Sequence, residues 1–323
     1  MEERKYKNMR YSILGNTGLK VSQATIGTWA IGGDGWGDTN KRDSIGAIRT
    51  MIDNGVNVID SAPFYGFGES EKIIGEAIKD IRKDVHLLTK CAVGLLPGKI
   101  PEKRANFDAI IQDCEDSMKR LQTDYIDLFL IHWPDDKTPL EETMGALMKL
   151  KQDGKIGYFG ASNFNKEQII ESRKYGDFDI IQQPYSMVAQ EFRSLLSWAH
   201  EENLGTMSYG SLGAGILTGG IRELPNFAAD DMRLNFYDYF KEPKFSKVME
   251  LVKRLDIYAE KYNVPVSQVT INWSTQSGFL DTILMGVRNA AEAEENCAAF
   301  SWELEQSDVD SITNDIDTIL GVE

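Results

Sequence analysis

Residues 57–80 read NVIDSAPFYGFGESEKIIGEAIKD, and they contain a strand, a loop and a helix in that order. The first part, Asn57–Asp60, is a short apolar run with the length and composition of a buried strand. A glycine-rich loop follows, and the last part, Ser70–Asp80, places its isoleucines on one helical stripe. Such a unit of strand, loop and helix is the building block of α/β proteins.

Eight apolar runs of strand length, this one included, are spaced along the chain. None of them alternates between apolar and polar residues, so each is expected to be buried on both faces, as in a parallel sheet. The predicted strands are Ala24–Gly27, Asn57–Asp60, His86–Lys90, Ile126–His132, Ile156–Ala161, Ile180–Gln183, Thr206–Tyr209 and Thr282–Gly286.

Segments with helical periodicity lie between these strands. They are Ser70–Asp80, Lys103–Arg120, Thr138–Asp153, Lys166–Tyr175, Glu191–Glu202 and Ala290–Ala299. Strand and helix repeated eight times close most naturally into an α/β fold of the (β/α)8 TIM-barrel type. With no linker and no shift in composition, we expect a single domain over residues 1–323.

Three segments do not fit the repeat. Tyr11–Ser22 reads as a β-hairpin ahead of the barrel, because two short strands flank a Gly-Asn-Thr-Gly turn. Gly220–Phe245 is an aromatic-rich insertion. Glu305–Leu320 has apolar residues at helical spacing and is predicted to be an extra C-terminal helix.

The composition narrows the classes of partner. The chain has 323 residues and a net charge of −15, which repels nucleic acid and anionic lipid. No apolar run reaches the length of a membrane helix, and no secretory signal is apparent, so we expect a cytoplasmic protein. The three cysteines indicate neither a disulfide framework nor a zinc site. We expect a monomer or a weak homo-oligomer.

Reactive side chains stand at or just after three consecutive predicted strands. Asp60, Lys90 and His132 each close a strand, and Tyr65 lies five residues after Asp60. In a parallel barrel these ends share one mouth. An ammonium group near a phenol favours the phenolate and is expected to lower the tyrosine pKa, while Asp60 would keep Lys90 charged. His132 would then polarise a carbonyl oxygen, and the set suits proton transfer to a forming alkoxide.

Each of these residues also has an ordinary structural interpretation. Asp60 could cap a helix, and Tyr65 could serve only to pack against its neighbours. Lys90 could extend to solvent, and His132 could be a hydrogen-bonded histidine of the core. Their convergence at consecutive strand ends favours the catalytic interpretation. A metal hydrolase is not expected, because the chain has three histidines and none is paired at short range.

The motifs around these residues resemble those of the aldo-keto reductases, and among them the bacterial general-stress branch. The resemblance covers roughly residues 10 to 315. It rests on Asp60-Ser-Ala-Pro-Phe-Tyr65-Gly-Phe-Gly-Glu-Ser-Glu, Leu88-Thr-Lys90, Asp127-Leu-Phe-Leu-Ile-His132-Trp-Pro, Gly27-Thr-Trp29-Ala-Ile-Gly-Gly, Gly154-Lys-Ile-Gly, Gly160-Ala-Ser162-Asn163-Phe, Ile181-Gln-Gln183-Pro-Tyr-Ser and Ser208-Tyr209-Gly-Ser-Leu-Gly-Ala-Gly.

This resemblance implies a barrel that binds NADP(H) without a dinucleotide-binding glycine fingerprint after a strand. It implies that Tyr65 is the general acid, that Asp60 and Lys90 tune it and that His132 positions the carbonyl. Ser162, Asn163 and Gln183 would bond the nicotinamide carboxamide, and Tyr209 would stack on the ring. The remaining contacts that it implies on this side are Thr28, Trp29, Asp60 and the pyrophosphate loop of Gly210, Ser211, Leu212, Gly213 and Ala214.

The adenosine end would be formed by Gly286, Val287, Arg288, Glu292 and Asn296. Arg288 offers a planar fork to a 2′-phosphate, so NADP(H) is the preferred cofactor and NAD(H) the alternative. Glu292 departs from the resemblance, which carries glutamine or arginine there. A carboxylate beside a 2′-phosphate is expected to narrow the preference for NADP(H).

The expected function is NADPH-dependent reduction of small aldehydes or ketones to alcohols. Two alternatives remain open: a cofactor-sensing protein like the potassium-channel β subunits, and a polyol or inositol dehydrogenase that runs the reaction in reverse. Substrate choice would lie in the loops Ile31–Thr39, Cys91–Pro101 and Gly220–Phe245. The aromatic residues expected to line an apolar mouth are Trp29, Trp36, Phe64, Trp133, Phe236 and Tyr237.

Overall fold

Eight parallel strands close into a barrel in the computed structural model, which describes residues 9–33, 36, 40–96, 100–228 and 231–321. Around the barrel the strands run in the order β10, β11, β12, β3, β4, β5, β8, β9 and back to β10. Their bounds are β3 Ala24–Gly27, β4 Val58–Asp60, β5 His86–Cys91, β8 Ile126–Ile131, β9 Ile156–Ser162, β10 Ile180–Pro184, β11 Gly205–Tyr209 and β12 Thr282–Gly286. The predicted (β/α)8 barrel is confirmed.

Each strand end lies within one residue of its predicted position, and β3 and β12 match the prediction at both ends. β4 begins at Val58 and not at Asn57: the N–H of Asn57 donates to Ser22 Oγ at 3.0 Å, outside the barrel, while its carbonyl still accepts from His86 N of β5 at 2.7 Å. The side-chain amide of Asn57 donates to Lys20 O at 2.9 Å. These bonds fix Asn57 to the N-terminal hairpin, and the barrel strand starts at the next residue.

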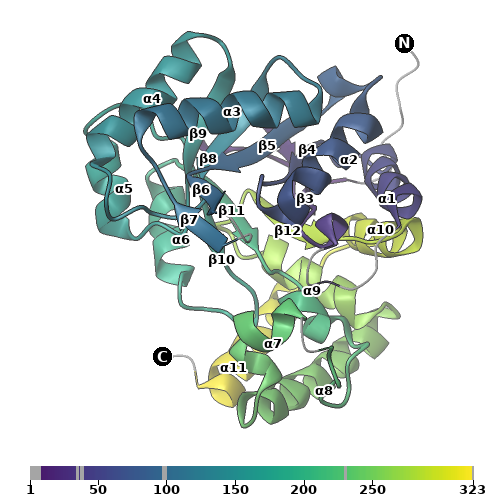
Figure 1. Cartoon of the computed structure of the whole chain (residues 1–323). Helices are drawn as coiled ribbons and strands as arrows, with labels where there is room; N and C mark the ends of the chain where they lie inside the picture. The colour runs from purple at the N-terminus through teal and green to yellow at the C-terminus, as the bar shows by residue number, and fades with distance from the viewer. Residues whose placement is uncertain (1–8, 34–35, 37–39, 97–99, 229–230, 322–323) are drawn as a thin grey trace.

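The helices surround the barrel, and Figure 1 shows α7, α8 and α11 together on one side of it. Polar caps set several of their starts: Asn106 accepts from Ala109 N before α3, and Asn165 forms a capping box before α5. The helices are α1 Lys41–Asp53, α2 Glu69–Ile78, α3 Phe107–Leu121, α4 Leu140–Gln152, α5 Lys166–Ser172, α6 Arg193–Glu201, α7 Met232–Phe236, α8 Lys244–Tyr262, α9 Val266–Thr275, α10 Ala290–Ala298 and α11 Gln306–Leu320.

The predicted hairpin and C-terminal helix are both present. β1 (Tyr11–Ile13) pairs antiparallel with β2 (Lys20–Ser22), and α11 occupies most of the predicted tail helix. Leu14 and Val21 of the hairpin are fully buried against inward-facing barrel residues such as Val58 and Ile180. The hairpin therefore closes the amino-terminal end of the barrel, and the opposite end is left for a site.

Two other segments differ from the prediction. β6 (Val93–Leu96) and β7 (Ile100–Lys103) form a second antiparallel hairpin in the predicted substrate loop Cys91–Pro101. For that reason α3 begins at Phe107 and not at Lys103. The predicted insertion Gly220–Phe245 contains α7 and the start of α8. No helix within the described ranges has both the length and the apolar composition needed to cross a bilayer.

Candidate active site

A cavity of about 570 Å³ opens at the carboxyl ends of the barrel strands. Its volume lies in the usual range for small-ligand sites. Residues from several strand ends line it, together with the segment that carries α7. From the ends of β4, β8, β9 and β11 and the loops after them come Asp60, Tyr65, His132, Ser162, Asn163 and Tyr209.

The structure brings the predicted catalytic residues together: Asp60, Tyr65 and His132 line this cavity, and Lys90 is buried against Asp60 and Tyr65 without lining it. The ammonium group of Lys90 lies 2.8 Å from each carboxylate oxygen of Asp60, 2.9 Å from Ser61 O and 3.4 Å from the Tyr65 hydroxyl. The side chains of Asp60 and Lys90 are each 1% exposed. The His132 ring meets the Tyr65 ring edge-on, with 5.9 Å between the ring centroids.

Tyr65 is held in place by close packing of backbone. It begins the short 3-10 turn η3 (Tyr65–Gly68), and Gly66 follows it with a φ of 58°. A Cβ atom at Gly66 would lie 2.2 Å from Gly32 O, in the turn η2 (Ala30–Gly32) that follows β3. Only glycine fits this approach, which fixes the direction of the tyrosine ring. The indole of Trp29 stacks on that ring at 5.9 Å.

The tyrosine pKa shifts in the direction opposite to the one expected. Burial raises the pKa of Tyr65 well above its ordinary value, and the negative charge of Asp60 adds to this. Desolvation of the phenolate outweighs the nearby ammonium group, since Lys90 is already neutralised by Asp60. The prediction of a lowered pKa was wrong for this site. The phenol therefore keeps its proton at neutral pH.

Burial also shifts the pKa values of the side chains around Tyr65. Burial raises the pKa of Asp60 and lowers the pKa of Lys90, and their contact with each other opposes both shifts. Burial, and then the charge of Lys90, lowers the pKa of His132 well below its ordinary value. His132 is thus a neutral imidazole near pH 7, which can share a hydrogen bond but is not a proton source.

Gln182, and not the predicted Gln183, faces the cavity. Gln182 Nε2 donates to Asp60 Oδ2 at 2.8 Å, whereas Gln183 Nε2 donates to Phe164 O at 2.7 Å. Successive strand residues point to opposite faces, and Gln182 follows the inward-facing Ile180 by two residues. Gln183 follows Ile181, which packs between barrel and helices. The two adjacent glutamines in the sequence give no signal of which one points inward.

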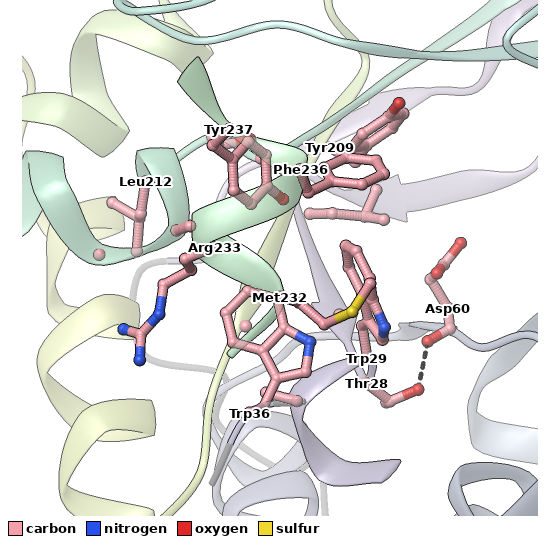
Figure 2. A pocket seen from close by; sticks show the side chains of 18 of the residues that line it. Thr28, Trp29, Trp36, Asp60, Tyr209, Leu212, Met232, Arg233, Phe236 and Tyr237 are labelled. Carbon is pink, nitrogen blue, oxygen red and sulfur yellow. Dashed lines mark hydrogen bonds between the residues drawn. The ribbon is translucent and has the colours of Figure 1, made fainter. Parts of the chain in front are cut away.

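Polar groups converge beside the predicted catalytic residues. Tyr209 OH donates to Asn163 Oδ1 at 2.8 Å, and Asn163 Nδ2 donates to His132 O at 2.8 Å. Asn163 adopts a left-handed φ of 62°, and Ser162 Oγ accepts from its amide at 3.1 Å. Thr28 Oγ1 donates to Asp60 O at 2.7 Å (Figure 2).

A segment with little side-chain bulk runs along the cavity after β11. Gly210, Ser211, Leu212 and Ala214 line the cavity, whereas Gly213 does not. Gly210 and Ala214 have left-handed φ values of 72° and 52°, a backbone conformation that aims successive amides to one side. This segment can offer backbone N–H groups to an anionic group such as the pyrophosphate of a dinucleotide.

The outer end of the cavity is acidic. Gly286, Arg288, Glu292 and Asn296 line it as predicted, whereas Val287 is fully buried and does not. Glu295, within the predicted adenosine-end stretch, and Ser267, which sequence reasoning missed, also line it. Arg288 Nη2 donates to Glu292 Oε1 at 2.9 Å, so the predicted phosphate ligand is bonded to a carboxylate of its own chain.

All six aromatic residues predicted for the mouth line the cavity. Figure 2 shows that Phe236 and Met232, from α7, face Trp29 and Trp36, from the segment after β3. Met232 and Arg233 are additional lining residues that the sequence did not indicate. The indole N–H of Trp36 is buried without a hydrogen-bond partner in the described part of the chain. Residues 34–35, 37–39, 97–99 and 229–230 of the three predicted substrate loops lie outside the described residues.

Known proteins with similar sequence and structure cover nearly the whole chain. The family model of the aldo/keto reductase family matches residues 24–316. The aldo-keto reductase YhdN of Bacillus subtilis is 39% identical over 316 residues, 97% of this chain and 94% of that protein. The NADH-specific methylglyoxal reductase of Escherichia coli is 32% identical over 311 residues, 91% of this chain and 94% of the relative. The solved glycerol dehydrogenase of Gluconobacter oxydans has 30% identity and a TM-score of 0.88, covering 99% of this chain and 98% of its own.

Proposed function

The chain belongs to the aldo/keto reductase family, and we propose that it reduces small aldehydes or ketones to alcohols with a nicotinamide dinucleotide as hydride donor. One observation carries the proposal. The ammonium group of Lys90 joins the Asp60 carboxylate to the Tyr65 hydroxyl in the buried wall of the cavity. This chain of contacts is suited to giving a proton to an oxygen that becomes negative.

Tyr65 is the proposed proton donor. Because the pKa of its phenol is raised, the proton is present throughout the neutral range and is lost only to a stronger base, such as an alkoxide. Lys90, 3.4 Å away, would stabilise the phenolate left behind. The O–H bond of Tyr65 breaks as the O–H bond of the alcohol forms, and solvent restores the proton afterwards.

His132 is proposed to orient the carbonyl. Its imidazole is neutral and stands against the edge of the Tyr65 ring, so a ring N–H can donate to the same oxygen that Tyr65 protonates. Trp29 covers Tyr65 from another side and limits the approach of water. The two donors and the covering ring together define a small pocket for a carbonyl oxygen.

The residues present fit a nicotinamide dinucleotide. Bound there, such a cofactor would supply a hydride to the carbonyl carbon. Ser162, Asn163 and Gln182 offer polar groups for a carboxamide, and Tyr209 offers an aromatic face. The backbone after β11 would hold the pyrophosphate. NADP(H) was expected from Arg288. The nicotinamide and pyrophosphate contacts are common to NADP(H) and NAD(H), so the preference between the two depends on the residues at the acidic outer end of the cavity.

The substrate is proposed to be small and uncharged. The mouth is formed by aromatic side chains, and the cationic residues that line the cavity in the described part of the chain, Arg233 and Arg288, are each paired with a carboxylate. A sugar aldehyde or a 2-oxoaldehyde meets these conditions. The Escherichia coli relative is named for reduction of one such compound, methylglyoxal.

The test is turnover by the purified chain. NADPH and NADH are each mixed with a panel of aldehydes and ketones, and oxidation of the nucleotide is followed by its absorbance. We expect turnover on several members, and none with the Tyr65→Phe variant. Absence of turnover on every carbonyl, with nucleotide binding intact, would instead favour the cofactor-sensing alternative.

Oxidation of an alcohol is the second candidate, because a solved relative that matches over 98% of its own chain is named a glycerol dehydrogenase. The same residues serve that direction, with Tyr65 accepting the proton. Comparing kcat/KM for an aldehyde and its alcohol near neutral pH decides between them. A larger value for the alcohol would assign the chain to oxidation.

A further inference from the structure

Glu292 holds Arg288 at both ends. One carboxylate oxygen accepts from the guanidinium Nη2 of Arg288 at 2.9 Å, and the other accepts from the backbone N–H of the same residue at 2.9 Å. The side chain of Arg288 is 62% exposed and that of Glu292 is 33% exposed. The guanidinium of Arg288 is thus held at the start of α10 by the carboxylate of Glu292, which is the less exposed of the two side chains.

Glu292 is itself well fixed. It lies in the first turn of α10, where its backbone N–H donates to Asn289 Oδ1, the N-cap side chain, at 3.0 Å. A carboxylate in the first turn is favoured by the helix dipole. Its other oxygen also accepts from the backbone N–H of Arg288, the residue before the N-cap Asn289. Arg288 is therefore bonded to a group that has three reasons to stay in place.

The charges at this end add up to a negative sum. Glu295 also lines the cavity, where its Oε1 accepts from Ser267 Oγ at 2.7 Å. Two carboxylates and one guanidinium thus line this end of the cavity. The other arginine in the cavity wall, Arg233, is bonded to Asp231 through Nε at 2.9 Å and Nη2 at 2.7 Å. Each cation in the described lining already has a carboxylate partner.

A 2′-phosphate and a 2′-hydroxyl meet this arrangement differently. The phosphate would have to compete with Glu292 for Arg288 while lying near a second carboxylate, and like charges disfavour it. A ribose hydroxyl can donate to a carboxylate, which is how acidic residues select NAD over NADP elsewhere. We infer that Glu292 is a specificity-determining residue that makes the chain accept NADH at least as well as NADPH. The inference rests on the proposed function only in taking a nicotinamide dinucleotide as the ligand.

The experiment is calorimetric titration of the full chain with NADH and with NADPH, which requires no turnover. The wild-type protein is expected to bind NADH as tightly as NADPH or more tightly. Glu292→Gln frees the guanidinium, so NADPH should bind roughly tenfold more tightly, about 1.4 kcal/mol, while NADH changes little. Adding Arg288→Ala to Glu292→Gln should remove that gain.

Glu294→Gln is the matched control. It removes the same charge two residues along α10, from an exposed side chain that does not line the cavity. The ratio of the two affinities should not change in this variant. An equal gain with Glu294→Gln would show a general charge effect and overturn the inference.

Other outcomes also decide the matter. A wild-type protein that binds NADPH tenfold more tightly than NADH overturns the inference, and so does a Glu292→Gln variant with an unchanged ratio. Binding of neither nucleotide overturns the inference and the proposed function together. Selective binding without any turnover overturns only the proposed function, so the two failures are distinguishable.

Discussion

Gln182 and Asp60 lie on opposite strands of the barrel and are joined by a hydrogen bond of 2.8 Å across its mouth. Four strand steps separate β10 from β4 in either direction around the closed sheet. Asp60 Oδ2 accepts from both Gln182 and Lys90. The carboxylate that holds Lys90 is therefore oriented from the far side of the barrel.

The two adjacent glutamines provide a test of this arrangement. Gln182→Leu removes one donor from Asp60, so kcat/KM should fall by about tenfold. Gln183→Leu instead leaves Phe164 O without its partner, which should cost about 1 kcal/mol of stability and leave kcat/KM within about twofold. Steady-state kinetics and urea unfolding of both variants check this. Equal loss of activity in the two would contradict the assigned register.

The Asp60–Lys90 pair should show the energetics of a buried ion pair. Lys90→Met or Asp60→Asn alone leaves a buried charge without its partner, and each should lower the free energy of unfolding by about 3–5 kcal/mol. The double variant should lose clearly less than the sum of the single losses. Urea unfolding of the four proteins measures this. Additive losses would mean that the two groups do not stabilise each other.

Tyr65→Phe should lower kcat by about 10²–10⁴-fold and leave nucleotide affinity unchanged, because it removes only the hydroxyl group and keeps the ring. Since burial raises the pKa of Tyr65, the wild-type reduction should also lose activity with rising pH only above pH 10, where the proton leaves. Tyr158→Phe is the control, because its hydroxyl donates to Thr17 O of the N-terminal hairpin. Loss of reductase activity with rising pH already near pH 7 would contradict the protonated state assigned to Tyr65.

Asp113 should make stability depend on pH in an unusual direction. Its carboxylate on α3 accepts from Ala92 N at 3.0 Å and Arg104 Nη2 at 2.6 Å, and burial raises its pKa from 3.8 to about 6. The folded state keeps this proton up to pH 6, whereas the unfolded state releases it near 3.8. The stability that the proton contributes is therefore complete below pH 3.8 and lost as pH rises through 6.

Asp113→Asn removes this titration. From pH 4 to pH 7 the free energy of unfolding of the wild type should fall, relative to the variant, by up to about 3 kcal/mol. Urea unfolding at both pH values measures the difference. Asp116→Asn, at an exposed position of the same helix where the pKa is lowered, should show no such fall. Parallel curves for wild type and Asp113→Asn would refute the assignment.

Much of the fold followed from the sequence because the barrel strands are buried on both faces and read as unbroken apolar runs. The β6–β7 hairpin was missed because its apolar residues, such as Leu96 and Ile100, are exposed and have no periodic pattern. The convergence of Asp60, Tyr65, Lys90 and His132 was predictable because strand ends of a parallel barrel meet. Gln182 was missed because the strand register decides which side chain points into the barrel, and two adjacent glutamines do not reveal the register. The pKa of Tyr65 depends on burial, which only the structure supplies.

A dinucleotide has to reach the cavity through a region that repels it. Glu292 and Glu295 stand at the outer end, and the chain as a whole carries a net charge of −15. Dissolved salt screens such repulsion beyond about 8 Å at physiological ionic strength. The rate of encounter should therefore rise with salt, the reverse of electrostatically steered association. Arrival of the ligand is tied to the ionic strength of the surroundings, whereas the buried pair of Asp60 and Lys90 is shielded from it.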